Sequence, residues 1–276
     1  MFVKEKQNLF LKDKVATIIF TSEDLKDFVA TVLSATIKVP VSEIRDSLVI
    51  LPNRVNTNIN TQYSEVDALY KTNNSYINVE FNNYNYKTLD SKNNKYVCHL
   101  LLKQLKINKR NVEILPIYQI NINDYDKYGY GKFIYRSCMM EEELHVRRDN
   151  YLKIIDINLE YLREIEYTEI IKMSDESLEK LLYFFVNSDI EMLKKIYDGV
   201  DIMEKVVEKL IDLTEDLEDS LYYNREELRN ETLYGMGSDE TRLDIAKNLL
   251  KLNITDNDIM TATGLSKEEL ENLKNS

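Results

Sequence analysis

Residues 63–83 of the chain, YSEVDALYKTNNSYINVEFNN, predict a β-hairpin. Asn73 and Asn74 suit a two-residue turn, because Asn tolerates the positive φ that a type I′ turn requires. With this turn the numbers of facing residues sum to 147, and apolar residues face one another: Val66 and Phe81, Ala68 and Val79, Tyr70 and Ile77. A continuous apolar face supports this register, because a shift by one residue would turn every side chain to the opposite face.

The other face of this hairpin carries acidic side chains. It places Asp67 opposite Glu80, and Glu65 opposite Asn82. Facing side chains have Cβ atoms only about 4.5–5.5 Å apart, so two like charges there are destabilising. Two carboxylates beside a third acid suit a hard divalent cation such as Mg²⁺, which prefers oxygen ligands. The alternative is an ordinary polar sheet face with its acids pointing into water.

The rest of the chain alternates helices and strands before it becomes helical. The patterns predict a helix over 22–37 that Pro40 stops, an extended run over 46–56, a helix over 91–106, and strands over 113–125, 132–140 and 151–162. From about residue 168 onward the apolar spacing is helical. This order predicts an α/β fold in residues 1–167, followed by an all-helical C-terminal region in residues 168–276.

Charge divides the chain unevenly. The 276 residues have a formal net charge of −12, but residues 1–111 hold 16 Lys and Arg against 11 Asp and Glu. The remaining residues hold 20 Lys and Arg against 37 Asp and Glu. A basic front half is able to contact phosphate while the acidic half has another role.

No stretch approaches the roughly 18 consecutive apolar residues of a membrane span, and the N-terminus is too charged for a secretion signal. We therefore expect a cytoplasmic protein without a membrane partner.

The acidic residues of the hairpin also carry a family resemblance. Asp67, followed after thirteen residues by Glu80-Phe81-Asn82 at the end of a β-branched strand, resembles the core of the PD-(D/E)XK nucleases. The chain as a whole is similar to the Rpn-type, recombination-promoting and transposase-like group of that superfamily, in these segments: DKVATIIF (13–20), YQININDY (118–125), IIDINLEYL (154–162) and RLDIAKNLLKLNITDNDIMTATGLSKEELENLK (242–274). The resemblance implies a nuclease-like mixed sheet flanked by helices and a Mg²⁺-dependent DNA endonuclease, a hydrolase linked to recombination or a mobile element. Nothing in the sequence resembles a base-reading module, so we expect low sequence specificity.

The resemblance also implies roles for particular residues. Asp67 and Glu80 would bind Mg²⁺ or Mn²⁺. The third position is usually Lys, or Gln in many members of the group, whereas this chain has Asn82, which carries no charge and is no base at pH 7. Either a nearby lysine substitutes, for which Lys92 is the candidate, or activity is reduced or absent. In the second case the chain would act by binding DNA or a protein partner.

Two of these assignments have simpler alternatives. Lys92 precedes Tyr96, as a basic residue precedes a tyrosine in the family, but a solvated lysine near the start of a helix is an equally good interpretation. Asp13 is a further candidate acid, although an acid at such a position is more often at the surface.

The C-terminal segment 254–274 predicts two short helices around a turn. Thr255 can cap the first helix, Gly264 ends it, and Ser266 with Glu269 forms a capping box for the second. This pattern invites a DNA-binding interpretation, but residues 239–276 carry five Lys and Arg against eight Asp and Glu. Because groove-binding helices need cations facing phosphate, the segment predicts a structural or dimer-forming helical hairpin. A homodimer through the helical C-terminal region is the corresponding expectation.

Overall fold

A computed structural model describes most of the chain. The described residues are 13–56, 63–105, 114–148, 151–214, 246, 250, 255–263 and 267–274. By its internal contacts the chain divides into two units, Met1–Glu215 and Asp216–Ser276. The candidate site lies in the first unit.

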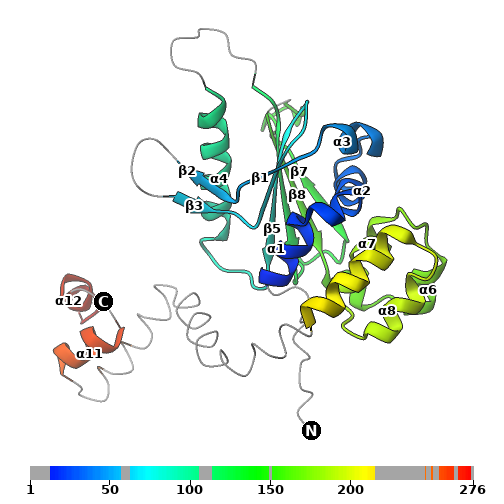
Figure 1. Ribbon diagram of the computed structural model, residues 1–276. Coiled ribbons are helices and arrows are strands. Elements are labelled where there is room, and N and C mark those ends of the chain that lie inside the picture. The colour runs from blue at the N-terminus through cyan, green and yellow to red at the C-terminus, as the bar shows by residue number, and fades with distance from the viewer. Residues whose placement is uncertain are drawn as a thin grey trace. The chain divides into compact units, whose positions relative to one another are not determined.

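A six-stranded mixed sheet forms the centre of the first unit (Figure 1). Its strands, in spatial order, are β1 (Val49–Leu51), β4 (Ala68–Lys71), β5 (Tyr76–Asn82), β6 (Ile117–Asn123), β8 (Leu152–Asn158) and β7 (Ile134–Ser137). The three central strands β5, β6 and β8 are parallel, and the other neighbours are antiparallel. The predicted mixed α/β sheet flanked by helices is therefore confirmed.

The hairpin has the predicted register but a different turn. Ala68 faces Val79 and Tyr70 faces Ile77. The turn is not type I′, because the non-glycine residues with positive φ in the described ranges are Lys38 and His145. Instead, the Thr72 hydroxyl accepts hydrogen bonds from the backbone N–H groups of Asn74 (3.2 Å) and Ser75 (3.0 Å). A side chain therefore stabilises the turn in place of left-handed asparagines.

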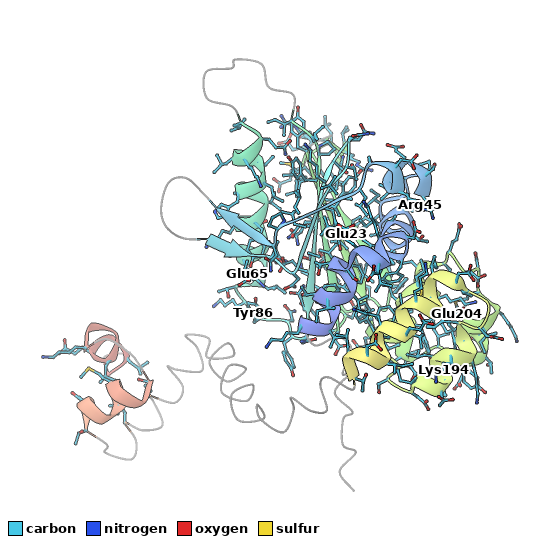
Figure 2. The ribbon with its side chains drawn as sticks, viewed as in Figure 1. Glu23, Arg45, Glu65, Tyr86, Lys194 and Glu204 are labelled. Carbon is cyan, nitrogen blue, oxygen red and sulfur yellow. The ribbon has the colours of Figure 1, made fainter. Side chains whose placement is uncertain are left out.

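The hairpin is also shorter than predicted, because the chain bends at Val66 and Asp67. Residues before this bend form β3 (Tyr63–Glu65), which pairs with β2 (Arg54–Asn56) in a separate two-stranded sheet. Glu65 consequently faces Arg54 and not Asn82. The predicted pairing of Glu65 with Asn82 is wrong, and Glu65 is exposed at the surface (Figure 2).

The two faces of the large sheet bury different kinds of side chain. On one face, aromatic rings from three parts of the chain meet: Phe81 of β5, Phe20 and Phe28 of the N-terminal helices, and Phe184 and Phe185. The N-terminal helical elements are α1 (Asp13–Thr21), η2 (Glu23–Leu25), α2 (Lys26–Ile37) and α3 (Val41–Ser47). The helix predicted over 22–37 thus begins as η2 and continues as α2, and it ends at Lys38, whose φ is 61°, before Pro40 is reached.

On the other face of the sheet lies α4 (Leu89–Gln104), close to the helix predicted over 91–106 (Figure 1). Tyr96, Val97 and Leu100 of α4 pack with Leu69 and Ile117. This apolar cluster covers only one end of the face. The remainder of the face is polar, and it contains the candidate site.

Helices follow the last strand of the sheet. β8 ends at Asn158, earlier than the predicted strand over 151–162, because α5 (Glu160–Arg163) begins there. Then follow α6 (Tyr167–Lys172), α7 (Leu178–Leu182), η3 (Tyr183–Phe185), α8 (Ile190–Ile196) and a helix over 201–214. Since Phe184 and Phe185 contact Phe28 and Phe20, these helices share the core of the sheet. The division by contacts accordingly falls after residue 215, later than the predicted boundary at 167.

The second unit contains α11 (Asp256–Thr263) and α12 (Lys267–Lys274), close to the two predicted helices. Ile259 and Leu270 are buried together with Ala246. The predicted turn at residues 264–266 and most of residues 215–254 lie outside the described residues, so an all-helical C-terminal region and the homodimer remain predictions. No helix in the described ranges is both long and apolar enough to cross a bilayer.

A single buried hydrogen bond ties the hairpin to α1. Tyr70 is fully buried, and its hydroxyl donates to the Phe20 carbonyl at 2.5 Å. This carbonyl lies in the last turn of α1, where no intrahelical donor remains. Tyr70→Phe should lower the free energy of unfolding by about 1–2 kcal/mol, because the buried carbonyl would lose its donor. Urea denaturation followed by circular dichroism measures the change; Tyr130→Phe, at a position 77% exposed, is the control and should have no effect.

Candidate functional site

The three parallel strands present a buried polar face toward α4. Their register forms three rows: Asn78, Gln119 and Ile154; Glu80, Asn121 and Asp156; Asn82, Asn123 and Asn158. Every polar member of these rows is at most 5% exposed. Parallel strands normally bury apolar residues on both faces. Eight buried polar residues on one face therefore need a structural or functional reason.

Hydrogen bonds connect these side chains into one network. Asn78 Nδ2 donates to Glu80 Oε1 (3.2 Å) and to Gln119 Oε1 (2.9 Å). Gln119 Nε2 donates to Asn121 Oδ1 (2.9 Å), and Asn121 Nδ2 donates to Asp156 Oδ1 (3.0 Å). A continuous series of amides thus joins two buried carboxylates, Glu80 and Asp156. Such a network gives most of these buried groups a hydrogen-bond partner, and each group would cost free energy if it were buried without one.

The hairpin places the first candidate carboxylates side by side. Phe81 N–H donates to Asp67 Oδ2 at 2.8 Å, and Asp67 N–H lies 3.4 Å from Glu80 Oε1. Asp67 sits at the bend between β3 and β4, where it is half-buried, whereas Glu80 is fully buried. The two predicted metal ligands are therefore held together by backbone contacts between the bend and β5.

Lys92 completes this group from α4. Its Nζ is 3.2 Å from Glu80 Oε2, and it also lies over the Tyr96 ring, 5.6 Å from the ring centre. The Lys92 side chain is 39% exposed, so it reaches from solvent to a buried carboxylate. Because α4 packs across the polar face, a lysine twelve residues after Glu80 in sequence becomes its charge partner. The interpretation of Lys92 as a solvated surface residue is thus inadequate.

Burial changes the protonation of this group. Burial, followed by the charge of Asp67, raises the pKa of Glu80 to about 7, and the neighbouring Lys92 limits the rise. Burial lowers the pKa of Lys92, but its interactions with Glu80, Tyr96 and Asp67 together outweigh burial, so the pKa of Lys92 is raised overall. Lys92 is consequently charged at neutral pH, while Glu80 is divided between its two forms. Perturbed pairs of this kind are typical of functional sites.

The other predicted residues lie elsewhere or have other partners. Asn82 is buried, and its Nδ2 donates to Asn123 Oδ1 at 2.9 Å, so it extends the amide network. Glu65, the expected third acid, is instead an acceptor for Asn53 Nδ2 at 3.4 Å on the small sheet. Asp13 is the first residue of α1, and its side chain lies outside the described part of the chain. The site therefore consists of Asp67, Glu80 and Lys92, supported by the amides.

A second charged group, not anticipated from the sequence, lies at the other end of the network. Lys127 Nζ is 2.8 Å from Asp90 Oδ1 and 3.4 Å from Asp156 Oδ1, and Tyr128 OH is 3.3 Å from Asp156 Oδ2. The sequence signal that would have revealed it is the alternation of polar and apolar residues in INVEFN, YQININ and KIIDIN. Three strands with this pattern share a polar face whenever they pair in parallel.

The two carboxylates of the site offer oxygen ligands, which a hard divalent cation prefers. Asp67 and Glu80 supply two carboxylates, and the ammonium of Lys92 already lies at the Glu80 carboxylate as a cation would. Mg²⁺ commonly takes one or two protein carboxylates with waters and substrate phosphate. In the described ranges no group of three or more His, Cys, Asp or Glu side chains converges to hold a metal ion. Two carboxylates alone would leave the remaining ligand positions of such a cation to water and substrate.

Comparison of the chain with protein-family models, with curated proteins and with solved structures finds no match. The function of the chain is consequently inferred from the geometry of the site and from the resemblance of its residues.

The raised pKa of Glu80 predicts a pH-dependent stability. The folded protein holds the proton of Glu80 more tightly than the unfolded chain does, because the pKa of Glu80 rises from 4.5 to about 7 on folding. Protonated Glu80 therefore stabilises the folded state fully below pH 4.5, and this stabilisation is lost as the pH rises through about 7. The stability of the wild type relative to Glu80→Gln should therefore fall by roughly 2–3 kcal/mol between pH 4.5 and 8. Urea denaturation of both proteins across this range measures the difference. Glu65→Gln is the control, and an equal pH dependence for both variants would contradict the assignment.

Proposed function

We propose that this chain is a metal-dependent DNA endonuclease of the PD-(D/E)XK type and of low sequence specificity. The observation that carries the proposal is the convergence of Asp67, Glu80 and Lys92. In the hairpin the backbone N–H of Asp67 lies 3.4 Å from Glu80 Oε1, and α4 brings Lys92 Nζ to 3.2 Å from Glu80 Oε2. These are the residues for which the family resemblance implies metal binding and substitution of the missing lysine.

The residues present have complementary roles in such a reaction. Asp67 and Glu80 would bind Mg²⁺ or Mn²⁺, which when bound polarises the scissile phosphate and lowers the pKa of a water molecule. Glu80 loses its proton more readily when a cation is near, so binding converts it fully to the carboxylate. Lys92 keeps its positive charge and is placed to attract a phosphate oxygen. The net positive charge of residues 1–111 favours contacts with the DNA backbone, which carry no sequence information.

Plasmid nicking in the presence of Mg²⁺ or Mn²⁺ tests the proposal. Asp67→Asn, Glu80→Gln and Lys92→Met should each reduce the nicking rate at least about 100-fold, the loss expected for a group that stabilises charge in the transition state. Glu65→Gln is the matched control, because Glu65 is an exposed acid two residues from Asp67. Absence of nicking by the wild type, or equal nicking by Asp67→Asn, would refute endonuclease activity.

One observation favours a second function, that of a catalytically weak nuclease-fold protein which acts by binding DNA or a protein partner. Asn82 occupies the position of the usual lysine or glutamine, and its amide is engaged with Asn123. It therefore offers no charge to the substrate, and its NH₂ group already donates to a neighbouring amide.

Calorimetry with Mn²⁺ separates the two functions. The nuclease proposal expects binding that weakens at least about tenfold in Asp67→Asn and strengthens as the pH rises through 7, because Glu80 must lose a proton. Failure of the wild type to bind Mn²⁺, or the appearance of cleavage only in Asn82→Gln or Asn82→Lys, would favour the binding protein.

A further inference from the structure

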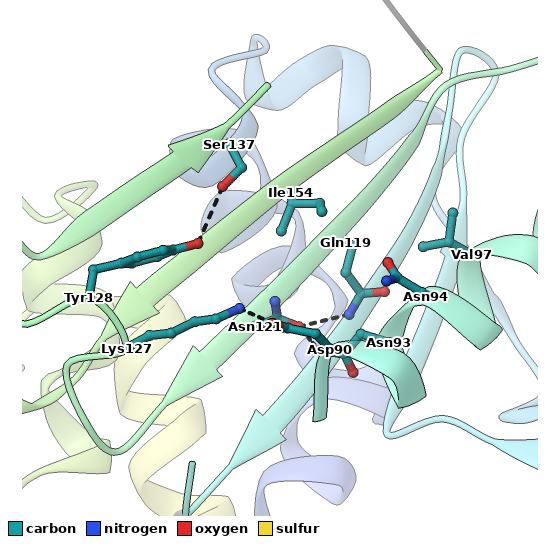
Figure 3. Close-up of a pocket in the computed structure, with 10 residues that line it drawn as sticks. All are labelled: Asp90, Asn93, Asn94, Val97, Gln119, Asn121, Lys127, Tyr128, Ser137 and Ile154. Carbon is teal, nitrogen blue, oxygen red and sulfur yellow. Dashed lines mark hydrogen bonds and ion pairs between the residues drawn. The ribbon is translucent and has the colours of Figure 1, made fainter. Parts of the chain in front are cut away.

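A small cavity opens beside the candidate metal site. It lies over β6 and β8, between α4 on one side and Lys127, Tyr128 and β7 on the other (Figure 3). Its volume is about 210 Å³. Asn121 belongs to its floor and is the cross-strand neighbour of Glu80, so the cavity begins one strand, roughly 4.8 Å, from the candidate metal ligand.

The amide network leaves one buried acceptor of a cavity-lining residue, Asn93, without a partner. Asp156 accepts from Asn121 Nδ2, so Asn121 Oδ1 must point the other way, toward Gln119 and Asn93. Both of these residues use their NH₂ groups to donate to it, at 2.9 and 3.0 Å. The orientation of Asn93 is thereby fixed. Its Oδ1 accepts no hydrogen bond from any described residue, although Asn93 is only 5% exposed and lines the cavity.

The charges around the cavity oppose an anionic ligand. Lys127 is the cation at its rim, and its Nζ is already within 3.4 Å of two carboxylates, Asp90 and Asp156. The local balance is therefore negative, which is unfavourable for phosphate. A neutral group that donates a hydrogen bond to Asn93 Oδ1 is compatible with these charges. Val97 and Ile154 add apolar surface, and Tyr128 adds an aromatic ring.

We propose that this cavity takes one unpaired nucleobase of a bound DNA strand. A nucleobase is neutral and flat, with apolar faces and an edge of N–H donors and acceptors. The cavity is smaller than the about 300–1,000 Å³ of sites for drug-sized ligands, which agrees with a single base. In a duplex the N–H edge is engaged with the opposite strand, so only a single-stranded or extruded base can enter. The inference rests on the proposed function and specifies its substrate: DNA that is single-stranded or opened near the cleaved phosphate.

Binding in metal-free buffer tests the cavity independently of cleavage. The probe is a labelled strand of abasic spacers that carries a single base, 2-aminopurine, and the reference is the same strand with no base. The strand with the base should bind at least about fivefold more tightly, the lower end expected for one stacked base. Its 2-aminopurine emission should also change on binding, because the base enters a new environment.

Two variants locate the effect. Ile154→Phe should abolish the advantage of the base by filling the cavity, while Leu102→Phe, at an exposed position of α4, should retain it. Circular dichroism checks that both variants are folded. Equal affinity of the wild type for the two strands would overturn the cavity proposal and leave the endonuclease proposal intact. Binding of neither strand would count against both.

Discussion

The hydrogen bond from Asn121 to the buried Asp156 carboxylate is the constraint on which the arrangement of the polar face depends. A carboxylate at this position can only accept, so it determines which end of the Asn121 amide points toward it. Each later amide must then be oriented to match its neighbour, as far as Asn78 and Glu80. All amides of the network are therefore oriented in one consistent sense. If one amide were reversed, two oxygens or two NH₂ groups would face one another in the interior.

This polar face is possible because the opposite face of the same sheet is strongly apolar. Phe20, Phe28, Phe81, Phe184 and Phe185 form a continuous aromatic cluster there, with ring centres 4.2–6.1 Å apart. Burial of apolar surface is the dominant favourable contribution to folding, and large aromatic side chains bury much of it. The helices after β8 supply two of these rings, so they stabilise the sheet that positions Glu80 and Asp156 and are not a separate appendage to it.

The network places two lysine–carboxylate pairs in different environments along one sheet face. Lys92 approaches Glu80 beside Asp67, the two acids of the proposed cation site. Lys127 instead lies between Asp90 and Asp156, where its charge is already compensated. The first environment matches the proposed metal ion with phosphate, and the second matches the proposed neutral hydrogen-bond donor. A phosphate and an adjacent base of one nucleic-acid strand have this combination of properties.

The sequence by itself determined the hairpin register, the order of helices and strands, and the proximity of Asp67 to Glu80. These features depend on contacts between residues near in sequence and on the alternation of apolar and polar residues along each strand. When a short turn joins two such strands, this alternation determines which residues face one another. It did not determine that the chain bends at Val66 and Asp67, which removed Glu65 from the site. Nor did it show that Lys92 pairs with Glu80, or that Asn78, Gln119, Asn121 and Asp156 form one network. These features were decided by the tertiary structure, because they require three strands far apart in the chain to pair in parallel and a helix to pack across them.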